Sequence, residues 1–162
     1  MATADQRQHG VALMGGMFAH RTQFGYVMMR PFALVYEQAM FDAFAAHPGQ
    51  VVIGAWDCSA YCINLARMVG MKDPSGNRYS GWGDSAEIRA NNPSFTDPSR
   101  ALPMAFCSWT HGVGHVAPVF RADRTNPTFM NHGGAGLNEV SYEDLNAAFG
   151  GERGLFSAVA HL

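Results

Sequence analysis

The sequence predicts an α+β fold in which N-terminal helices pack on a small antiparallel sheet. Two segments before residue 72 show the apolar spacing of helices, and three short extended segments follow residue 101. One more helical segment and a final extended segment close the chain. Because the helices precede the strands instead of alternating with them, the order favours an α+β arrangement over a parallel α/β sheet.

The composition indicates a single domain over residues 1–162. With 48% hydrophobic and 15% charged residues, a chain of 162 residues can bury a core without disulfides or metals. The formal net charge is −2 and no run of like charges occurs, so we expect no nucleic-acid partner. No apolar stretch reaches membrane-spanning length, so we expect no contact with a membrane.

The N-terminus and the cysteines bear on the compartment. The first ten residues, MATADQRQHG, lack the basic and apolar regions of a signal peptide, and we expect them to be a frayed end. Three cysteines are too few for a disulfide scaffold, which favours a reducing compartment. We therefore expect synthesis in the cytoplasm, without an export signal of its own.

The first half of the chain predicts two main helices. One is expected from Pro31, in its first turn, to the Pro48-Gly49 pair that ends it. After the short extended segment QVVIGAW, a second helix is expected from its cap Asp57 to Gly70. Residues 72–101 are rich in Pro, Gly, Asn and Ser and predict a loop with one short helix near 84–90.

The second half predicts the sheet. Extended segments are expected over 102–109, 115–122 and 128–133, followed by a helix capped by Ser141 and a last strand in GLFSAVAHL. Pro118 lies inside the second of these segments. Since proline lacks an N–H to donate, it predicts an edge strand or a bulge there.

Two of the three cysteines lie on one turn of the helix that Asp57 caps. Cys62 belongs to a regular apolar stripe and is expected to be a packing residue; the stripe is Cys58, Cys62, Leu65, Ala66 and Val69. Cys58 also lies in the first helical turn. There, unpaired backbone N–H groups and the helix dipole favour a thiolate and should lower the thiol pKa. Cys58 is therefore the candidate nucleophile.

A cysteine nucleophile needs a base, and His115 is the best candidate among the seven histidines. It follows a Gly-rich turn and begins an extended segment, so a sheet can hold it rigidly against a helix end. Its imidazole needs an acceptor on the far nitrogen, and the next extended segment offers Asn131 and His132. Because side chains alternate along a strand, only one of the two can face His115.

The segment DCSAYCINLARMVGM resembles the nucleophile segment of NlpC-type cell-wall cysteine peptidases, which runs Asp-Cys-Ser-Gly, an apolar helix and then a Gly. Cys58 and Gly70, twelve positions apart, reproduce that spacing. LPMAFCSW and GHVAPVF are similar to the family's next block, which carries the catalytic His, and TFMNHGGAG to the strand after it. GNRYSGW is similar to versions in phage lysins. The resemblance covers residues 50–137 and implies a papain-like fold.

The chain departs from the family pattern at several positions. Ala60 replaces the usual Gly, Met104-Ala105 replaces a Gly-Asp pair, and the spacing from His115 to His132 is longer than usual. A related amidase branch would point to Cys62 as the nucleophile. The spacing to Gly70 and the preceding Asp favour Cys58.

The resemblance implies a peptidoglycan hydrolase that cleaves an amide bond in the stem peptide, most often between D-glutamate and the diamino acid. Cys58 would attack the carbonyl and His115 would protonate the leaving amine. A third residue would orient the imidazole, and the resemblance favours His132 over Asn131 in that role. The expected substrate contacts are Tyr26, Asp57, Ser59 and Trp82.

The resemblance also bears on partners and location. No cofactor and no metal are expected, and the oligomeric state stays open. The enzyme would act on the bacterial wall after release or delivery, and an inhibitor or immunity protein would be a further partner.

Two other classes of protein remain open on the sequence. Cys107, His111 and His115 recur at a helical spacing that could hold zinc, although the glycines of THGVGH and the Pro118 that follows disfavour a helix there. The other class is a binding domain that keeps the fold without catalysis.

Overall fold

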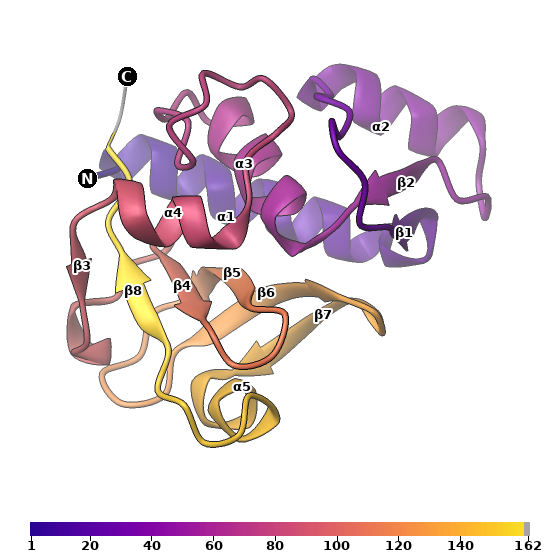
Figure 1. Ribbon diagram of the computed structural model, residues 1–162. Helices are drawn as coiled ribbons and strands as arrows, with labels where there is room; N and C mark the ends of the chain where they lie inside the picture. Colours follow the sequence, from indigo (N-terminus) through magenta and orange to yellow (C-terminus); the bar gives the residue numbers. More distant parts are fainter. Residues whose placement is uncertain (161–162) are drawn as a thin grey trace.

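The computed structural model describes residues 1–160 and shows an α+β fold (Figure 1). Its centre is a six-stranded sheet in the order β3-β8-β4-β5-β6-β7, and every neighbouring pair is antiparallel. The strands are β3 (Ser94–Phe95), β4 (Phe106–Trp109), β5 (His115–Arg121), β6 (Thr128–Gly133), β7 (Gly136–Ser141) and β8 (Leu155–Ser157).

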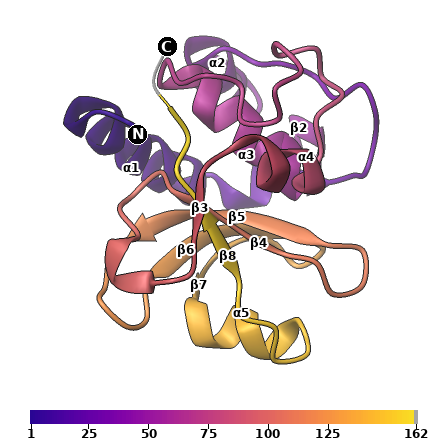
Figure 2. The ribbon, with the colours of Figure 1, turned by 60° about the vertical axis from the view of Figure 1, so that its left-hand side comes forward.

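Helices cover both faces of this sheet unequally. Four of them lie on one face and α5 lies on the other, as both ribbon views show (Figures 1 and 2). The helices are α1 (Ala4–Ala19), α2 (Glu37–Ala46), α3 (Cys58–Met68), α4 (Ser85–Asn91) and α5 (Tyr142–Ala148), with short 3-10 turns at Arg21–Gln23 and Pro98–Arg100. Among residues 1–160, no helix has the length and apolar character required to cross a membrane.

The alternation of side chains along the strands creates two cores, one on each face of the sheet. On β4, Phe106 packs in the core beneath α1 and α3, whereas Cys107 and Trp109 pack in the core beside α5. On β5, Val116 and Ala117 divide between the two cores in the same way. A residue's parity on a strand therefore decides whether it can face the helix that carries Cys58.

A separate two-stranded sheet leads into α3. Its strands, β1 (Phe24–Tyr26) and β2 (Ile53–Trp56), are parallel, and Tyr26 pairs with Trp56. The short extended segment expected before Asp57 is thus confirmed as β2. Its pairing with β1 brings residue 26 beside the start of α3.

The expectation of a frayed N-terminus is wrong, because α1 begins at Ala4. Thr3 and Gln6 form a capping box: the Thr3 side chain accepts from Gln6 N at 3.2 Å and Gln6 Oε1 accepts from Thr3 N at 2.9 Å. Buried Leu13, Met14 and Met17 then attach the helix to the core. Packing of this face, more than helix propensity, holds the segment in place.

The expected start of the next helix at Pro31 is also wrong, since α2 begins only at Glu37. The backbone of the intervening residues bonds elsewhere: Phe32 N donates to Gly81 O at 2.9 Å, and Val35 N donates to Asn64 Oδ1 at 2.9 Å. Those donors are committed to the loop before α4 and to α3. The segment therefore forms no helix before Glu37.

The sheet follows the sequence expectations with three differences. The first extended segment is shorter than expected, since β4 begins at Phe106. Two strands were not expected: β7, and β3, which lies in the segment expected to be a loop. Pro118 lies on the interior strand β5, so the edge alternative is wrong. The pairing of β5 with β6 begins at Val119 and shows an irregularity before Arg121, as the bulge alternative predicts.

Candidate functional site

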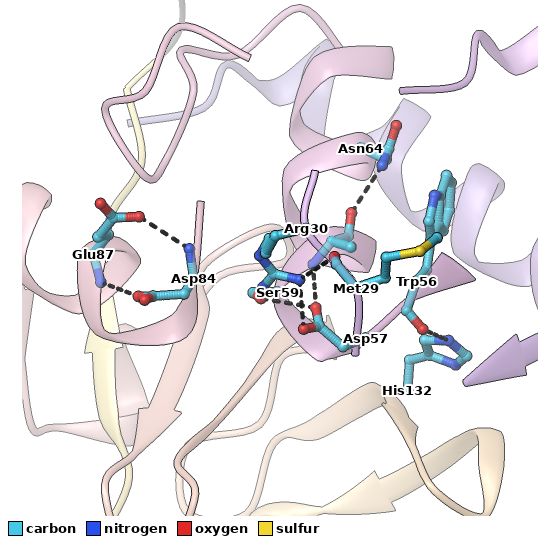
Figure 3. A network of polar contacts seen from close by, with 10 residues as sticks. Met29, Arg30, Trp56, Asp57, Ser59, Asn64, Asp84, Glu87 and His132 are labelled. Atoms are coloured by element: carbon cyan, nitrogen blue, oxygen red, sulfur yellow. Dashed lines mark hydrogen bonds and ion pairs between the residues drawn. The ribbon is translucent and has the colours of Figure 1, made fainter. Parts of the chain in front are cut away.

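Cys58 is the first residue of α3, as the sequence predicts, and Asp57 is the N-cap. Asp57 Oδ1 accepts hydrogen bonds from Ala60 N at 2.8 Å and from Ser59 Oγ at 2.8 Å. Figure 3 shows these contacts at the start of the helix. Cys62 lies one turn deeper and is fully buried, and its thiol points at the carbonyl of Val116, 3.8 Å away. Cys62 therefore packs in the core, as the sequence predicts.

The Cys58 thiol is more buried than a free helix end would be. Only 6% of the residue is exposed, and this burial raises the pKa of the thiol to about 11. The Val116 and Ser59 backbone N–H groups and the Tyr26 hydroxyl act in the opposite direction by hydrogen bonding the thiolate. The expected lowering of this pKa is wrong, because desolvation outweighs the helix start.

Tyr26 lies beside Cys58, and this proximity follows from strand pairing. Tyr26 pairs with Trp56, two residues before the cysteine, and its hydroxyl hydrogen bonds the Cys58 side chain. Burial, with the negative charge that Cys58 and Asp57 can carry, raises the pKa of Tyr26 to about 12. The phenol is therefore a neutral hydrogen-bond donor at physiological pH.

Arg30 completes the surroundings of the helix start. Its Nη1 pairs with Asp57 Oδ2 at 2.8 Å, and its Nη2 donates to Ser59 Oγ at 2.7 Å (Figure 3). Both carboxylate oxygens of Asp57 and the hydroxyl of Ser59 are thereby engaged within the protein. Asp57 and Ser59 were expected to contact the substrate. In this structure their side chains instead hydrogen bond within the protein and hold the start of α3 in place.

His115 begins β5 and is held by Asn131. Its Nε2 lies 2.6 Å from Asn131 Oδ1, and Asn131 Nδ2 donates to Asn138 Oδ1 at 2.9 Å. The second bond fixes the amide so that its oxygen faces the imidazole, which makes Nε2 the protonated nitrogen and leaves Nδ1 unprotonated in the neutral ring. The ring also stacks on Phe149, with centroids 5.1 Å apart. Burial lowers the pKa of His115.

His132 does not contact His115, so the expected orienting residue is wrong in its facing. Its Nε2 lies 3.2 Å from the carbonyl oxygen of Trp56, and its ring packs against the rings of Tyr26 and Tyr61. Asn131 and His132 are neighbours on β6 and point to opposite faces of the sheet. Burial lowers the pKa of His132, which fits a structural role beneath β1 and β2.

The link between Cys58 and His115 runs through the backbone of β5. The backbone N–H of Val116, the residue after His115, lies near the Cys58 sulfur and acts to lower its pKa. Within residues 1–160, no hydrogen bond joins the Cys58 thiol directly to the His115 imidazole. By alternation along β5, His115 shares the face of Ala117, where its ring stacks on Phe149, whereas Val116 faces α3. The Cys58 thiol and the His115 imidazole therefore have no preformed contact.

Trp82 and the zinc candidates lie apart from this cluster. Trp82 is 59% exposed on the loop before α4. Cys107 and His115 are on neighbouring strands and His111 is in the turn between them, so the helical spacing that would group them does not form. Within the part of the chain that the structure describes, no three His, Cys, Asp or Glu side chains gather as metal ligands would.

Sequence reasoning missed Arg30 and Asn138. Arg30 precedes Asp57 by 27 positions and no local pattern links the two, since the salt bridge depends on where the segment before α2 crosses α3. Asn138 lies on the unexpected strand β7, opposite Asn131. A hairpin signal, GGAG between two extended segments, was present and would have placed Asn138 there.

Comparison with known proteins adds no identification: no family model, no curated protein and no solved structure matches this chain.

Proposed function

We propose that the protein is a cysteine hydrolase of papain-like, NlpC-type fold that cleaves an amide bond in the peptidoglycan stem peptide. The observation that carries the proposal is the set Cys58, His115 and Asn131. The cysteine begins a helix, and the histidine, one residue from the backbone N–H that contacts its sulfur, is oriented by an amide oxygen. A Cys-His-Asn set of this kind is the one that papain-like proteases use.

The protonation states of Cys58 and His115 define the mechanism. With the thiol pKa raised and the imidazole pKa lowered, the resting pair is a thiol and a neutral imidazole. His115 Nδ1 then removes the Cys58 proton as the sulfur attacks the amide carbonyl, and the imidazolium returns a proton to the leaving amine. Water activated by the same nitrogen hydrolyses the thioester. Because the His115 ring stacks on Phe149 in this structure, the step requires substrate binding to reorient the imidazole toward Cys58.

Two groups can stabilise the negative charge that develops on the carbonyl oxygen. The backbone N–H of Cys58 lies at a helix start, where N–H groups lack intrahelical partners. The Tyr26 hydroxyl, neutral and beside the sulfur, is a second donor. Both come from elements that the β1–β2 pairing fixes in place.

Digestion of purified peptidoglycan, with mass analysis of the fragments, tests the proposal. Cys58→Ala should abolish hydrolysis and keep the fold. Cys62→Ala should stay active and lose about 1–2 kcal/mol of stability, the cost of a small cavity in the core. Cys107→Ala, another buried cysteine away from α3, is the matched control. An active Cys58→Ala with an inactive Cys62→Ala would place the nucleophile one turn away.

A non-catalytic binding domain is the second candidate, and the buried, protonated state of Cys58 favours it. Iodoacetamide discriminates between the two candidates.

In a hydrolase, alkylation of Cys58 removes activity irreversibly and a chelator leaves the rate unchanged. Activity lost to EDTA and restored by zinc would instead support a metal enzyme.

A further inference from the structure

Strand β7 lies at one end of the six-stranded sheet and has an open edge. Among residues 1–160 it pairs only with β6, with Thr128 opposite Ser141 and Asn131 opposite Asn138. The edge strand of a sheet exposes backbone N–H and C=O groups that can pair with another chain. Because β7 is six residues long, its edge is long enough to hold an added strand.

The hydrogen-bond pattern of the β6–β7 hairpin shows which backbone groups point outward. Tyr142 N donates to Pro127 O at 2.9 Å, which sets the phase of the ladder. Since hydrogen-bonded and non-hydrogen-bonded pairs alternate in an antiparallel ladder, Leu137 and Glu139 belong to non-hydrogen-bonded pairs. The N–H and C=O groups of these two residues therefore point away from β6. Within residues 1–160 they form no backbone hydrogen bond with another element.

A cavity of about 560 Å³ lies along this edge. One wall is β7 with the turn before it, from residue 135 to residue 139. The other wall comes from the end of α1, the 3-10 turn after it and β1; it consists of Phe18, Arg21, Thr22 and Phe24. Leu137 and Phe24 belong to the same core, so this wall rises over the helix-covered face of β7 while the cavity follows its edge.

Arg21 adds a positive charge to the second wall. The residue is exposed, and its guanidinium lies 4.9 Å from the centre of the Phe18 ring. No carboxylate of the described residues forms an ion pair with it. Glu139, which lines the same cavity, is instead paired with Arg121 at 2.9 Å and accepts a hydrogen bond from Thr128 at 2.7 Å. Arg21 is therefore available to a carboxylate of a ligand.

We propose that the outer edge of β7 binds an extended peptide segment of a partner protein, which adds to the sheet as an antiparallel strand. The outward groups of Leu137 and Glu139 fit such a ligand because they have the spacing of a β-ladder. Residues of the added strand that bond to them have side chains on the same face as Leu137, toward the second wall. One of these should be apolar, to pack on Phe18, and the next, two positions away, should be acidic, to meet Arg21.

A second copy of the chain fits this edge less well than a single segment. Antiparallel pairing of two β7 strands about a two-fold axis would place the second walls of both copies beside each other, on the same face of the joined sheet. It would also bring the two Arg21 side chains toward each other, where like charges repel. One extended segment meets neither obstacle.

Amide hydrogen exchange, measured residue by residue by NMR on the whole chain, tests the edge. In the free protein the Leu137 and Glu139 amides should exchange fast, whereas the Asn138 and Val140 amides, which donate to β6, should exchange slowly. The probe is the peptide acetyl-Ser-Val-Thr-Glu-Thr-amide at millimolar concentration. At saturation it should slow the exchange of Leu137 and Glu139 about tenfold or more and leave the other two amides unchanged.

Two N-methylated versions of the peptide separate backbone pairing from side-chain contact. Methyl groups on the Val and Glu nitrogens remove the N–H groups that face β7 and should abolish the protection. Methyl groups on the two Thr nitrogens lie on the far edge of the added strand and should leave the protection in place. Arg21→Gln should weaken the unmodified peptide about threefold, as expected for an exposed ion pair, and should not affect a peptide with Gln in place of Glu.

Arg124→Gln, on the exposed turn between β5 and β6, is the matched control and should change neither affinity. Fast exchange of Leu137 and Glu139 at every peptide concentration, or equal binding of the two N-methylated peptides, would overturn the proposal. Protection of these amides in the free protein would overturn it too, and sedimentation would then show whether a second copy occupies the edge. Peptidoglycan digestion is scored separately, because this surface does not depend on the proposed hydrolase.

Discussion

Burial decides the protonation of the two candidate catalytic residues. It raises the pKa of Cys58 to about 11 and lowers the pKa of His115, so a neutral pair exists over a wide pH range. Activity should fall as the pH drops and His115 takes a proton, and should persist well above pH 9. The rate profile on peptidoglycan should therefore be a broad bell.

Alkylation of Cys58 by iodoacetamide, followed by mass spectrometry from pH 6 to 11, measures the thiol directly. The rate should rise along the whole range, because only the thiolate reacts. A plateau reached below pH 8 would mean a preformed thiolate–imidazolium pair and would contradict the neutral resting state.

Substitutions of Asn131 and His132 should have different effects, the first on the catalytic rate and the second on stability. Asn131→Ala removes the acceptor that holds the His115 ring and should lower kcat at least about tenfold with little change in KM. His132→Ala should leave kcat near normal and cost about 2–3 kcal/mol, because the ring fills the core under β1 and β2. Asn138→Ala, which only loosens Asn131, should give an intermediate kcat. A slow His132→Ala with a normal Asn131→Ala would reverse these roles.

The start of α3 depends on a contact between elements. Arg30, from the segment before α2, pairs with the buried Asp57 carboxylate that caps the helix. Arg30→Met should cost about 2–3 kcal/mol, since it leaves a buried charge without its partner. Arg121→Met breaks an exposed pair with Glu139 and should cost less than about 1 kcal/mol.

Urea denaturation of the two variants compares the pairs. Similar losses in both would mean that Arg30 contributes no more than a surface ion pair, and that the cap of α3 is stable without it.

The helix and strand content was accessible from local patterns where those patterns are complete. The cap Asp57, the stripe on α3 and the final Gly70, which adopts a φ of +69°, all act within one helix, and α3 was predicted almost to the residue. Helix α5 with its cap Ser141 was predicted for the same reason. The segment after Pro31 was not, because its backbone donors bond to α3 and to the loop before α4.

The whole molecule couples its stability to pH through two buried histidines. Burial lowers the pKa of both His115 and His132, so the unfolded chain binds more protons than the folded one below about pH 6.5. The free energy of unfolding should therefore fall as the pH drops below that value. The slope can approach about 1.4 kcal/mol per pH unit for each group.

Denaturation at pH 7.5, 6.0 and 5.0 measures this loss. His132→Gln, which keeps a donor for the Trp56 carbonyl but does not titrate, should reduce the slope. An unfolding free energy that does not change between pH 7.5 and 5.0 would show that neither histidine is held neutral by the fold.

By itself, the sequence determined the α+β class, the helix that begins at Cys58 and the packing of Cys62 in the core. These properties depend on the periodicity of apolar residues and on capping residues within four positions of the helix that they cap, so they can be recognised in the local sequence. It also narrowed the partner of His115 to Asn131 and His132.

Only the tertiary structure decided between those two, because the choice depends on which face of β6 meets β5. It likewise decided the protonation of Cys58, which follows from how deeply β1, β5 and α3 bury the thiol. The Arg30–Asp57 pair also depends on the tertiary structure. It joins residues distant in the chain, and their proximity exists only once the segment before α2 has packed on α3.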